Sequence, residues 1–182
     1  MANLYTKNNY TTEDGRVVVL PRGVNVDIQK NLVRLCIANV SYPIVNKTLT
    51  LDQKVQLGCD LLTKQIINGH PPGNLRYNLN QVKIHSKTSS TGFPYKEVRY
   101  RYPDVGENKI VYKRRYIGIT IPDTPENMNA LLSEIDKILY EKRTEFTTEF
   151  LDRIPTDIAV VPKCYYRQYN QLLTRKIARL QE

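Results

Sequence analysis

The chain has few of the residues on which catalytic, metal and disulfide chemistry usually depends. Its 182 residues include no tryptophan, three cysteines and two histidines. No apolar run approaches the roughly 18 residues that a membrane-spanning helix needs. The first ten residues are polar and lack the apolar segment of a secretory signal. We therefore expect a protein that is neither secreted nor a membrane protein, and that is not stabilised by disulfides.

The cysteines and histidines form no recognisable motif. Cys36, Cys59 and Cys164 are far apart and include no CxxC pair, so we interpret them as buried, reduced thiols. Neither His70 nor His85 lies in a catalytic pattern. Phosphate-binding glycine loops, HExxH and EF-hand patterns are also missing. The sequence predicts no enzyme activity, no cofactor and no metal site.

Charge is abundant and unevenly distributed. The net charge is +9, an excess that favours nucleic acid or an acidic protein as a partner. Residues 85–120 contain eight Lys or Arg and three acids, whereas residues 123–152 contain three Lys or Arg and eight acids. The two segments could neutralise each other, either within one subunit or between neighbouring subunits.

Hydrophobic spacing predicts helices in three or four places. Asp27 could cap a helix over residues 28–40, and Thr50 could cap a second one that ends near Asn68. The strongest helix begins near Pro125, with Thr124 or Asp123 as its cap, and ends before Pro155. A last amphipathic helix is predicted over residues 166–180.

Alternation and β-branched residues predict several strands. The expected strands cover residues 16–20, 75–84 and 157–161, with a polar loop over residues 86–94. The clearest β signal is a long hairpin over about residues 95–121, whose strands Tyr95–Tyr102 and Lys109–Ile121 flank a six-residue loop. This mixture predicts an α+β fold, in which helices pack on one face of an antiparallel sheet. Residues 1–15 are expected to form a polar arm, and residues 16–182 a single domain.

The hairpin carries an unusual alternation of cations and tyrosines. Because successive side chains of a strand point to opposite faces, Arg99 and Arg101 should oppose Val98, Tyr100 and Tyr102. On the second strand, Lys113 and Arg115 should share a face with Val111 and Ile117. The predicted partner-binding or nucleic-acid-binding residues are Arg99, Tyr100, Arg101, Tyr102, Tyr112, Lys113, Arg114, Arg115 and Tyr116, with Arg175, Lys176 and Arg179 near the C-terminus.

Two functions of different classes fit these features. The first is a non-enzymatic structural subunit of a large multi-chain assembly, as a homo-oligomer or with other subunits. The missing catalytic motifs, the opposite charges of successive segments and the polar N-terminal arm favour such a subunit. Abundant Asn, Lys, Ile and Tyr are typical of an AT-rich genome, a bias shared by many bacteria, their phages and other viruses. Within this class we expect a virion component of the ring, connector or tail-completion type. Such a protein would be located in the virion or in the host cytoplasm. The alternative is a module that binds DNA or RNA through the basic hairpin.

Overall fold

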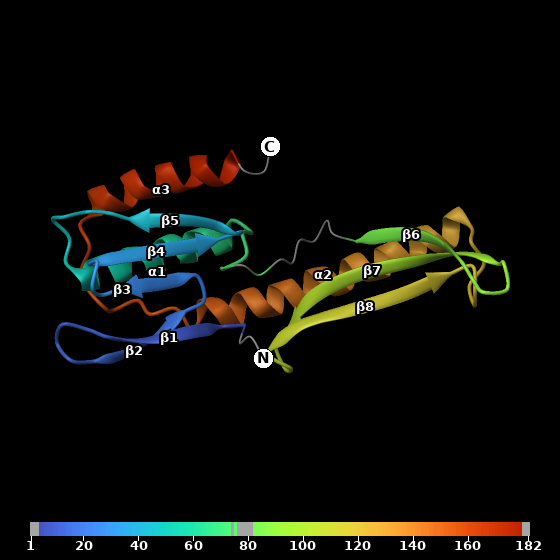
Figure 1. The fold of residues 1–182 in the computed structure, drawn as a ribbon, viewed down its shortest axis with the longest axis horizontal. Coiled ribbons are helices and arrows are strands. Elements are labelled where there is room, and N and C mark those ends of the chain that lie inside the picture. Colours follow the sequence, from blue (N-terminus) through green and yellow to red (C-terminus); the bar gives the residue numbers. More distant parts are fainter. Residues whose placement is uncertain (1–3, 74, 76–81, 180–182) are drawn as a thin grey trace. The chain divides into compact units, whose positions relative to one another are not determined.

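The computed structural model describes residues 4–73, 75 and 82–179. Three antiparallel sheets and three helices make up this part of the chain (Figure 1), which confirms the predicted α+β class. By their contacts the residues group into two compact units. The hairpin unit extends to Phe146 and is described from residue 82; the two-sheet unit comprises the described residues before residue 77 and after Phe146. The expectation of one domain over residues 16–182 stays a prediction, since a compact unit need not fold independently.

The two-sheet unit contains five strands and two helices. Strands β1 (Thr6–Thr11) and β2 (Val17–Pro21) pair in one antiparallel sheet. The second sheet has the order β3 (Val24–Asp27), β4 (Leu32–Ile37), β5 (Val40–Ile44). Helices α1 (Leu51–Ile67) and α3 (Lys163–Ala178) complete the unit, with α1 against β3 and β4 and α3 against α1 and β5.

The predicted helix over residues 28–40 is wrong, because this segment contains the β3–β4 turn, strand β4 and the turn into β5. Tight turns at Asn31 (φ 47°) and at Ala38 and Asn39 (φ 49° and 65°) interrupt any helix there. Between them Val33, Leu35 and Ile37 are all buried. Alternate burial is the period of a strand. The apparent helical spacing came from residues that lie on different strands.

Residues expected to form a polar arm are instead paired and packed. The strand β1 occupies Thr6–Thr11, and Leu4, Tyr5 and Tyr10 are 4% exposed or less. The Tyr10 hydroxyl donates a hydrogen bond to Asp52 of α1. Hydrophobic anchors spaced between polar residues therefore fix this segment, although its composition is that of an arm.

Helix α1 begins as predicted. The Thr50 side chain accepts a hydrogen bond from the backbone of Gln53, and the Gln53 side chain accepts one from the backbone of Thr50, which is a capping box. Gly58 faces the sheet, where an added Cβ would lie 3.4 Å from Val33 Cγ1 and 3.5 Å from Ile44 Cδ1. The glycine thus marks a close approach between helix and sheet.

One predicted strand is not found where it was expected, and another cannot be compared because it falls mostly outside the described residues. Residues 157–161 are irregular, because side chains of α1 bind their backbone: Ile158 N donates to Gln56 Oε1 over 2.8 Å, and Gln53 Nε2 donates to Val160 O over 3.1 Å. Most of the strand predicted over residues 75–84 lies outside the described residues. The strand β6 occupies Lys83–Thr88, so part of the predicted polar loop is also a strand.

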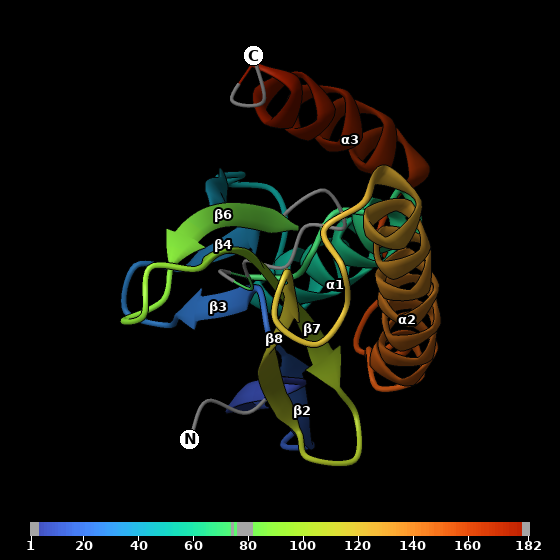
Figure 2. The ribbon, with the colours of Figure 1, turned by 90° about the vertical axis from the view of Figure 1, so that its right-hand side faces the viewer.

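The hairpin unit consists of one sheet and one long helix. Strand β7 (Pro94–Asp104) pairs with β6 on one side and with β8 (Lys109–Ile117) on the other, as the hairpin prediction required. Helix α2 (Pro125–Leu151) begins at the Thr124 cap, whose hydroxyl accepts a hydrogen bond from Asn127 N. Seen end-on in Figure 2, α2 runs along one side of β7 and β8. Only its residues up to Phe146 belong to the hairpin unit.

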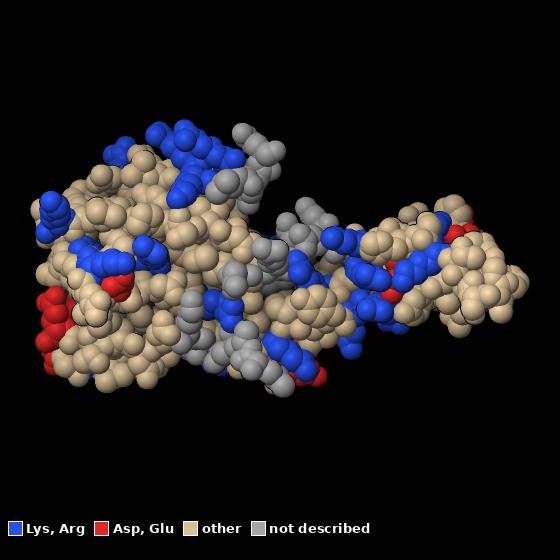
Figure 3. Space-filling model, viewed as in Figure 1, with Lys and Arg blue, Asp and Glu red and all other residues tan. Residues whose placement is uncertain are grey.

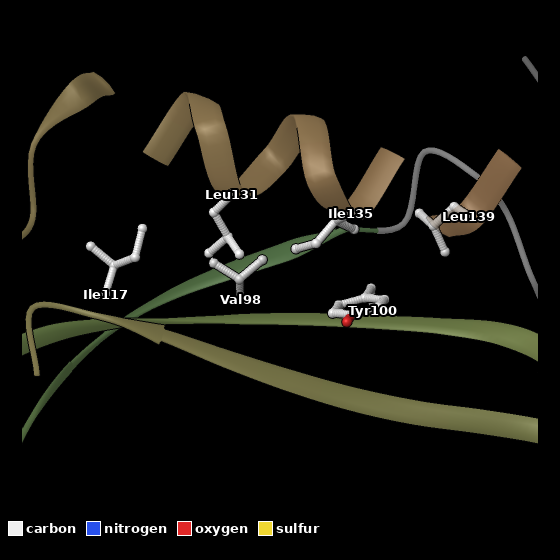
Figure 4. Close-up of a cluster of buried hydrophobic side chains, with 6 residues drawn as sticks. All are labelled: Val98, Tyr100, Ile117, Leu131, Ile135 and Leu139. Carbon is white, nitrogen blue, oxygen red and sulfur yellow. The ribbon is translucent and has the colours of Figure 1, made fainter. Parts of the chain in front are cut away.

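Apolar side chains fix α2 to this sheet. Figure 4 shows Leu131, Ile135 and Leu139 of the helix above Val98 and Tyr100 of β7, with Ile117 of β8 beside them. Val98, Ile117 and Ile135 are completely buried. Helix α2 therefore covers one face of the sheet, and no other described residues of this unit form a layer on the opposite face.

Candidate binding face

The strand register divides the β6–β7–β8 sheet into two faces. Residues directly opposite each other share a face, and Glu97 is opposite both His85 of β6 and Tyr116 of β8. We call the face that contains Glu97 and lacks α2 the open face. Its described residues include Lys83, His85, Lys87, Tyr95, Glu97, Arg99, Arg101, Tyr112, Arg114 and Tyr116.

The face under α2, the covered face, takes four of the predicted site residues. Tyr100 is 6% exposed within the core cluster, and Tyr102 packs against the same cluster. Arg115 Nη2 lies 2.9 Å from Glu134 Oε1 of α2. Lys113 shares this face but is exposed at the edge strand β8. The predicted alternation of side chains is confirmed by the register, and it places both tyrosines in the fold's interior.

A single buried carboxylate organises the open face. Glu97 Oε2 lies 2.5 Å from Lys87 Nζ and 2.8 Å from Arg99 Nη2, while Glu97 Oε1 lies 3.6 Å from Arg114 Nε. The Glu97 side chain is 1% exposed. Hydrogen bonds from Arg99 and then from Lys87 stabilise the ionised form, and they lower the pKa of Glu97 from 4.5 to about 2. Each of the three strands thus contributes one cation that pairs with this carboxylate.

The open face keeps an excess of positive charge after these ion pairs form. Its described residues include five cations and one carboxylate, the cations being Lys83, Lys87, Arg99, Arg101 and Arg114. Figure 3 looks onto the sheet from the side away from α2 and shows Lys and Arg gathered along it. Oε1 of Glu97 and Nε of Arg99 are buried without a hydrogen-bond partner among the described residues. The excess of cations on this face therefore attracts anions.

Exposed tyrosines lie among these cations. Tyr112 is 71% exposed and Tyr116 is 41% exposed. The rings of Tyr95 and Tyr116 meet edge to face, with centroids 6.0 Å apart. Rings that are already packed against a neighbour lose little freedom on binding, and tyrosine offers both apolar area and a hydroxyl. These are properties of a contact surface for protein or for unpaired bases.

The three predicted C-terminal cations belong to the other unit. The buried side of α3 contains Tyr169, Leu173 and Ile177. The exposed side carries the three cations Arg175, Lys176 and Arg179. Lys176 Nζ donates to Ser41 O over 2.7 Å and lies 5.7 Å from the centre of the Tyr42 ring. Lys176 therefore helps to fix α3 to β5, a structural role that the sequence did not indicate.

The cysteines only partly match the expectation of buried thiols. Cys59 is completely buried, and burial raises the pKa of its thiol to about 12. Cys36 is partly exposed, and Cys164 at the start of α3 is exposed. Among the described residues, no group of three or more His, Cys, Asp or Glu side chains could hold a metal ion. None of the described helices is both long enough and apolar enough to span a lipid bilayer.

Half of the open face was missed by the sequence analysis. Lys83, His85 and Lys87 lie in a segment predicted as a strand end and a loop, and no local pattern predicts the register that places them beside β7. Glu97 could have been found, because it is an acid between Lys96 and Arg99 that shares the strand parity of Arg99. Tyr95 shares the parity of Glu97 and Arg99 and could have been found in the same way.

The chain was compared with protein-family models, with curated proteins and with solved structures, and none of them matches it.

Proposed function

We propose that the protein is a non-catalytic subunit of a multi-chain assembly, and that it binds a neighbouring subunit through the open face. The observation that carries the proposal is the contrast between the two faces of the β6–β7–β8 sheet. The covered face is filled by α2, whereas the open face presents cations and exposed tyrosines. An amphipathic sheet face of this kind has the composition of an interface with an acidic partner.

The acidic side of α2 in a second copy of the chain is a complementary surface. Glu126, Asp136 and Glu141 are exposed on α2 and make no ion pair with any described residue. The open face of one copy would meet these carboxylates of the next copy. Because the two contacting surfaces differ, the contact is head-to-tail, and such contacts produce rings or filaments.

Glu97 prepares the open face for this contact. Its carboxylate fixes Lys87 and Arg99 at 2.5 and 2.8 Å. Long cationic side chains normally lose conformational entropy when they become ordered in an interface. Side chains that are ordered beforehand lose less, so the ion pairs favour docking.

A virion is the setting that we propose for this assembly, with the chain as a ring, connector or tail-completion subunit. The support is the composition of the chain together with a head-to-tail mode of contact. Location in the virion or in the host cytoplasm is part of the same proposal.

Self-association at high protein concentration tests the proposal. Size-exclusion chromatography with light scattering should show oligomers whose population falls as salt rises, because salt screens the opposed charges. The variant Asp136→Lys with Glu141→Lys should reduce the oligomers while leaving the circular dichroism spectrum unchanged. A strict monomer at all concentrations and salt levels, with no heterologous complex in pull-down, would contradict the proposal.

Nucleic-acid binding is a second candidate, favoured by exposed Tyr112 and Tyr116 among the cations of the open face. Tyrosines can stack on unpaired bases while Arg and Lys contact phosphates. Fluorescence anisotropy with single-stranded DNA should then show an affinity that decreases steeply with salt, because neutralised phosphates release counterions. Absence of binding to DNA and RNA at low salt would reject this candidate and leave the subunit proposal unaffected.

A further inference from the structure

A second basic feature lies in the two-sheet unit, at the end where the β3–β4 turn, the β5–α1 loop and the first turns of α1 meet (Figure 1). These three segments surround a pocket of about 340 Å³, which is at the lower end of the size range of small-molecule sites. Its lining residues are Lys30, Asn31, Leu32, Val45, Asn46, Lys47 and Lys54. Three lysines and no acid therefore line the pocket.

Lys54 is buried without a counter-charge. The residue is 2% exposed, and its ammonium donates to Asn31 O over 2.8 Å and to Asn31 Oδ1 over 3.0 Å. None of the described carboxylates pairs with it, and desolvation lowers the pKa of Lys54. Buried charges in proteins are normally paired. An ammonium has three N–H donors, so one remains after the two bonds to Asn31.

The neighbours of Lys54 increase the positive potential of the pocket. Lys47 is exposed, and no carboxylate of the described residues forms an ion pair with it. Lys30 lies 3.6 Å from Asp27, a weak pair at the surface. The side-chain oxygen of Asn31 already accepts from Lys54, so its amide nitrogen is available as a donor. Asn31 lies in a left-handed turn (φ 47°) beside the first turn of α1, where it accepts the hydrogen bonds from Lys54.

We propose that this pocket binds a small anion that carries phosphate groups. The Lys54 ammonium supplies a buried charge, Lys47 and Lys30 supply mobile charges at the rim, and the Asn31 amide supplies a neutral donor. Phosphate oxygens accept several charge-assisted hydrogen bonds at once, which suits a pocket with donors on three sides. The pocket and the open face belong to different units, so this proposal does not depend on the proposed function.

Titration with inorganic pyrophosphate tests the proposal on the full chain. At constant ionic strength, calorimetry should show saturable binding, and amide signals of residues 30–32, 45–47 and 54 should shift in ¹H–¹⁵N spectra. Lys47→Gln and Lys54→Met should each weaken binding about tenfold or more, as expected for the loss of a charged hydrogen-bond donor. Lys47→Gln keeps the test valid if Lys54→Met impairs folding, because Lys47 is exposed.

Lys64→Gln is the matched control, since Lys64 is an exposed lysine of the same helix outside this pocket. Its affinity for pyrophosphate should equal that of the unmodified chain. Displacement of pyrophosphate by single-stranded DNA would identify the phosphates of a nucleic acid as the natural ligand, and failure of displacement would identify a free anion. Equal weakening by all three substitutions, or no saturable binding, would overturn the proposal.

Discussion

Arg114 and Arg115 are neighbours in sequence but lie on opposite faces of one sheet. Arg114 belongs to the open face and lies 3.6 Å from buried Glu97. Arg115 belongs to the covered face and pairs with Glu134 of α2 over 2.9 Å. One arginine therefore belongs to the proposed contact surface, and its neighbour attaches α2 to the sheet. Strand parity, more than residue type, thus decides which face a cation of this hairpin serves.

The two faces also differ in how they hold their charges. On the open face, one buried carboxylate pairs with cations from all three strands. On the covered face, Arg115–Glu134 and Lys96–Asp123 are pairs of partly exposed groups that link the sheet to α2 and its preceding loop. Among the described residues, the ion pairs Arg115–Glu134 and Lys96–Asp123 thus join the basic segment to the acidic one on the covered face. This leaves the open face basic and part of α2 acidic.

The two faces should differ most in the free energy of unfolding that is lost when a large side chain is truncated. Ile135 is completely buried against the sheet, so Ile135→Ala should decrease the free energy of unfolding by about 2–5 kcal/mol. Tyr112 is 71% exposed on the open face, and Tyr112→Ala should change it by no more than about 0.5 kcal/mol. Urea unfolding measures both values. Equal losses would show that the open face is part of the folded core.

Removal of the Glu97 carboxylate should cause the second-largest loss of stability. Glu97→Gln leaves Lys87, Arg99 and Arg114 close together without their anion, which destabilises a buried site. Glu134→Gln is the matched control on the covered face, where the lost pair is exposed. The midpoint temperature of thermal unfolding, Tm, should decrease more for Glu97→Gln than for Glu134→Gln. The reverse order would mean that Glu97 does not organise the open face.

Acid should weaken the fold through the same carboxylate. Because the pKa of Glu97 is lower in the folded chain, its contribution to stability is complete above pH about 4.5 and is lost as the pH falls through about 2. Unfolding curves of the wild type and of Glu97→Gln should therefore converge as the pH is lowered over this range. A constant difference between the two proteins would contradict the lowered pKa.

The smallest effect is expected for the exposed pair on the covered face. Arg115→Gln removes its partnership with Glu134, and both side chains are about half exposed, at 50% and 55%. Exposed ion pairs contribute about 1 kcal/mol or less. The free energy of unfolding should decrease by no more than this amount, as measured by urea titration. A loss comparable to that of Ile135→Ala would show that the pair is an essential attachment of α2.

Local patterns were sufficient for strands β7 and β8 and for the start of α2. The start of α2 followed from Thr124 and Pro125, and the faces of β7 and β8 followed from simple alternation. Both are decided by neighbouring residues, so the sequence contains them directly. The same alternation showed that Arg99 and Arg114 would oppose Val98 and Ile117.

Features that depend on distant residues were not predictable. The spacing of Leu32, Leu35 and Val40 imitated a helix, and only the turns at Asn31 and Ala38–Asn39 reveal three strands. The pairing of β6 with β7, which brings Lys87 to Glu97, requires a register that no local signal sets. The pocket around Lys54 combines a turn, a loop and a helix, and its lysines are not adjacent in sequence.

Two adjacent cations of β8 test most directly whether the chain is bound through the open face. Arg114→Gln and Lys113→Gln remove the same charge at adjacent positions of β8, the first on the open face and the second on the covered face. Light scattering at high protein concentration should show weaker self-association for Arg114→Gln and unchanged self-association for Lys113→Gln, with both variants folded. Equal behaviour of the two variants, or a larger loss for Lys113→Gln, would contradict the claim.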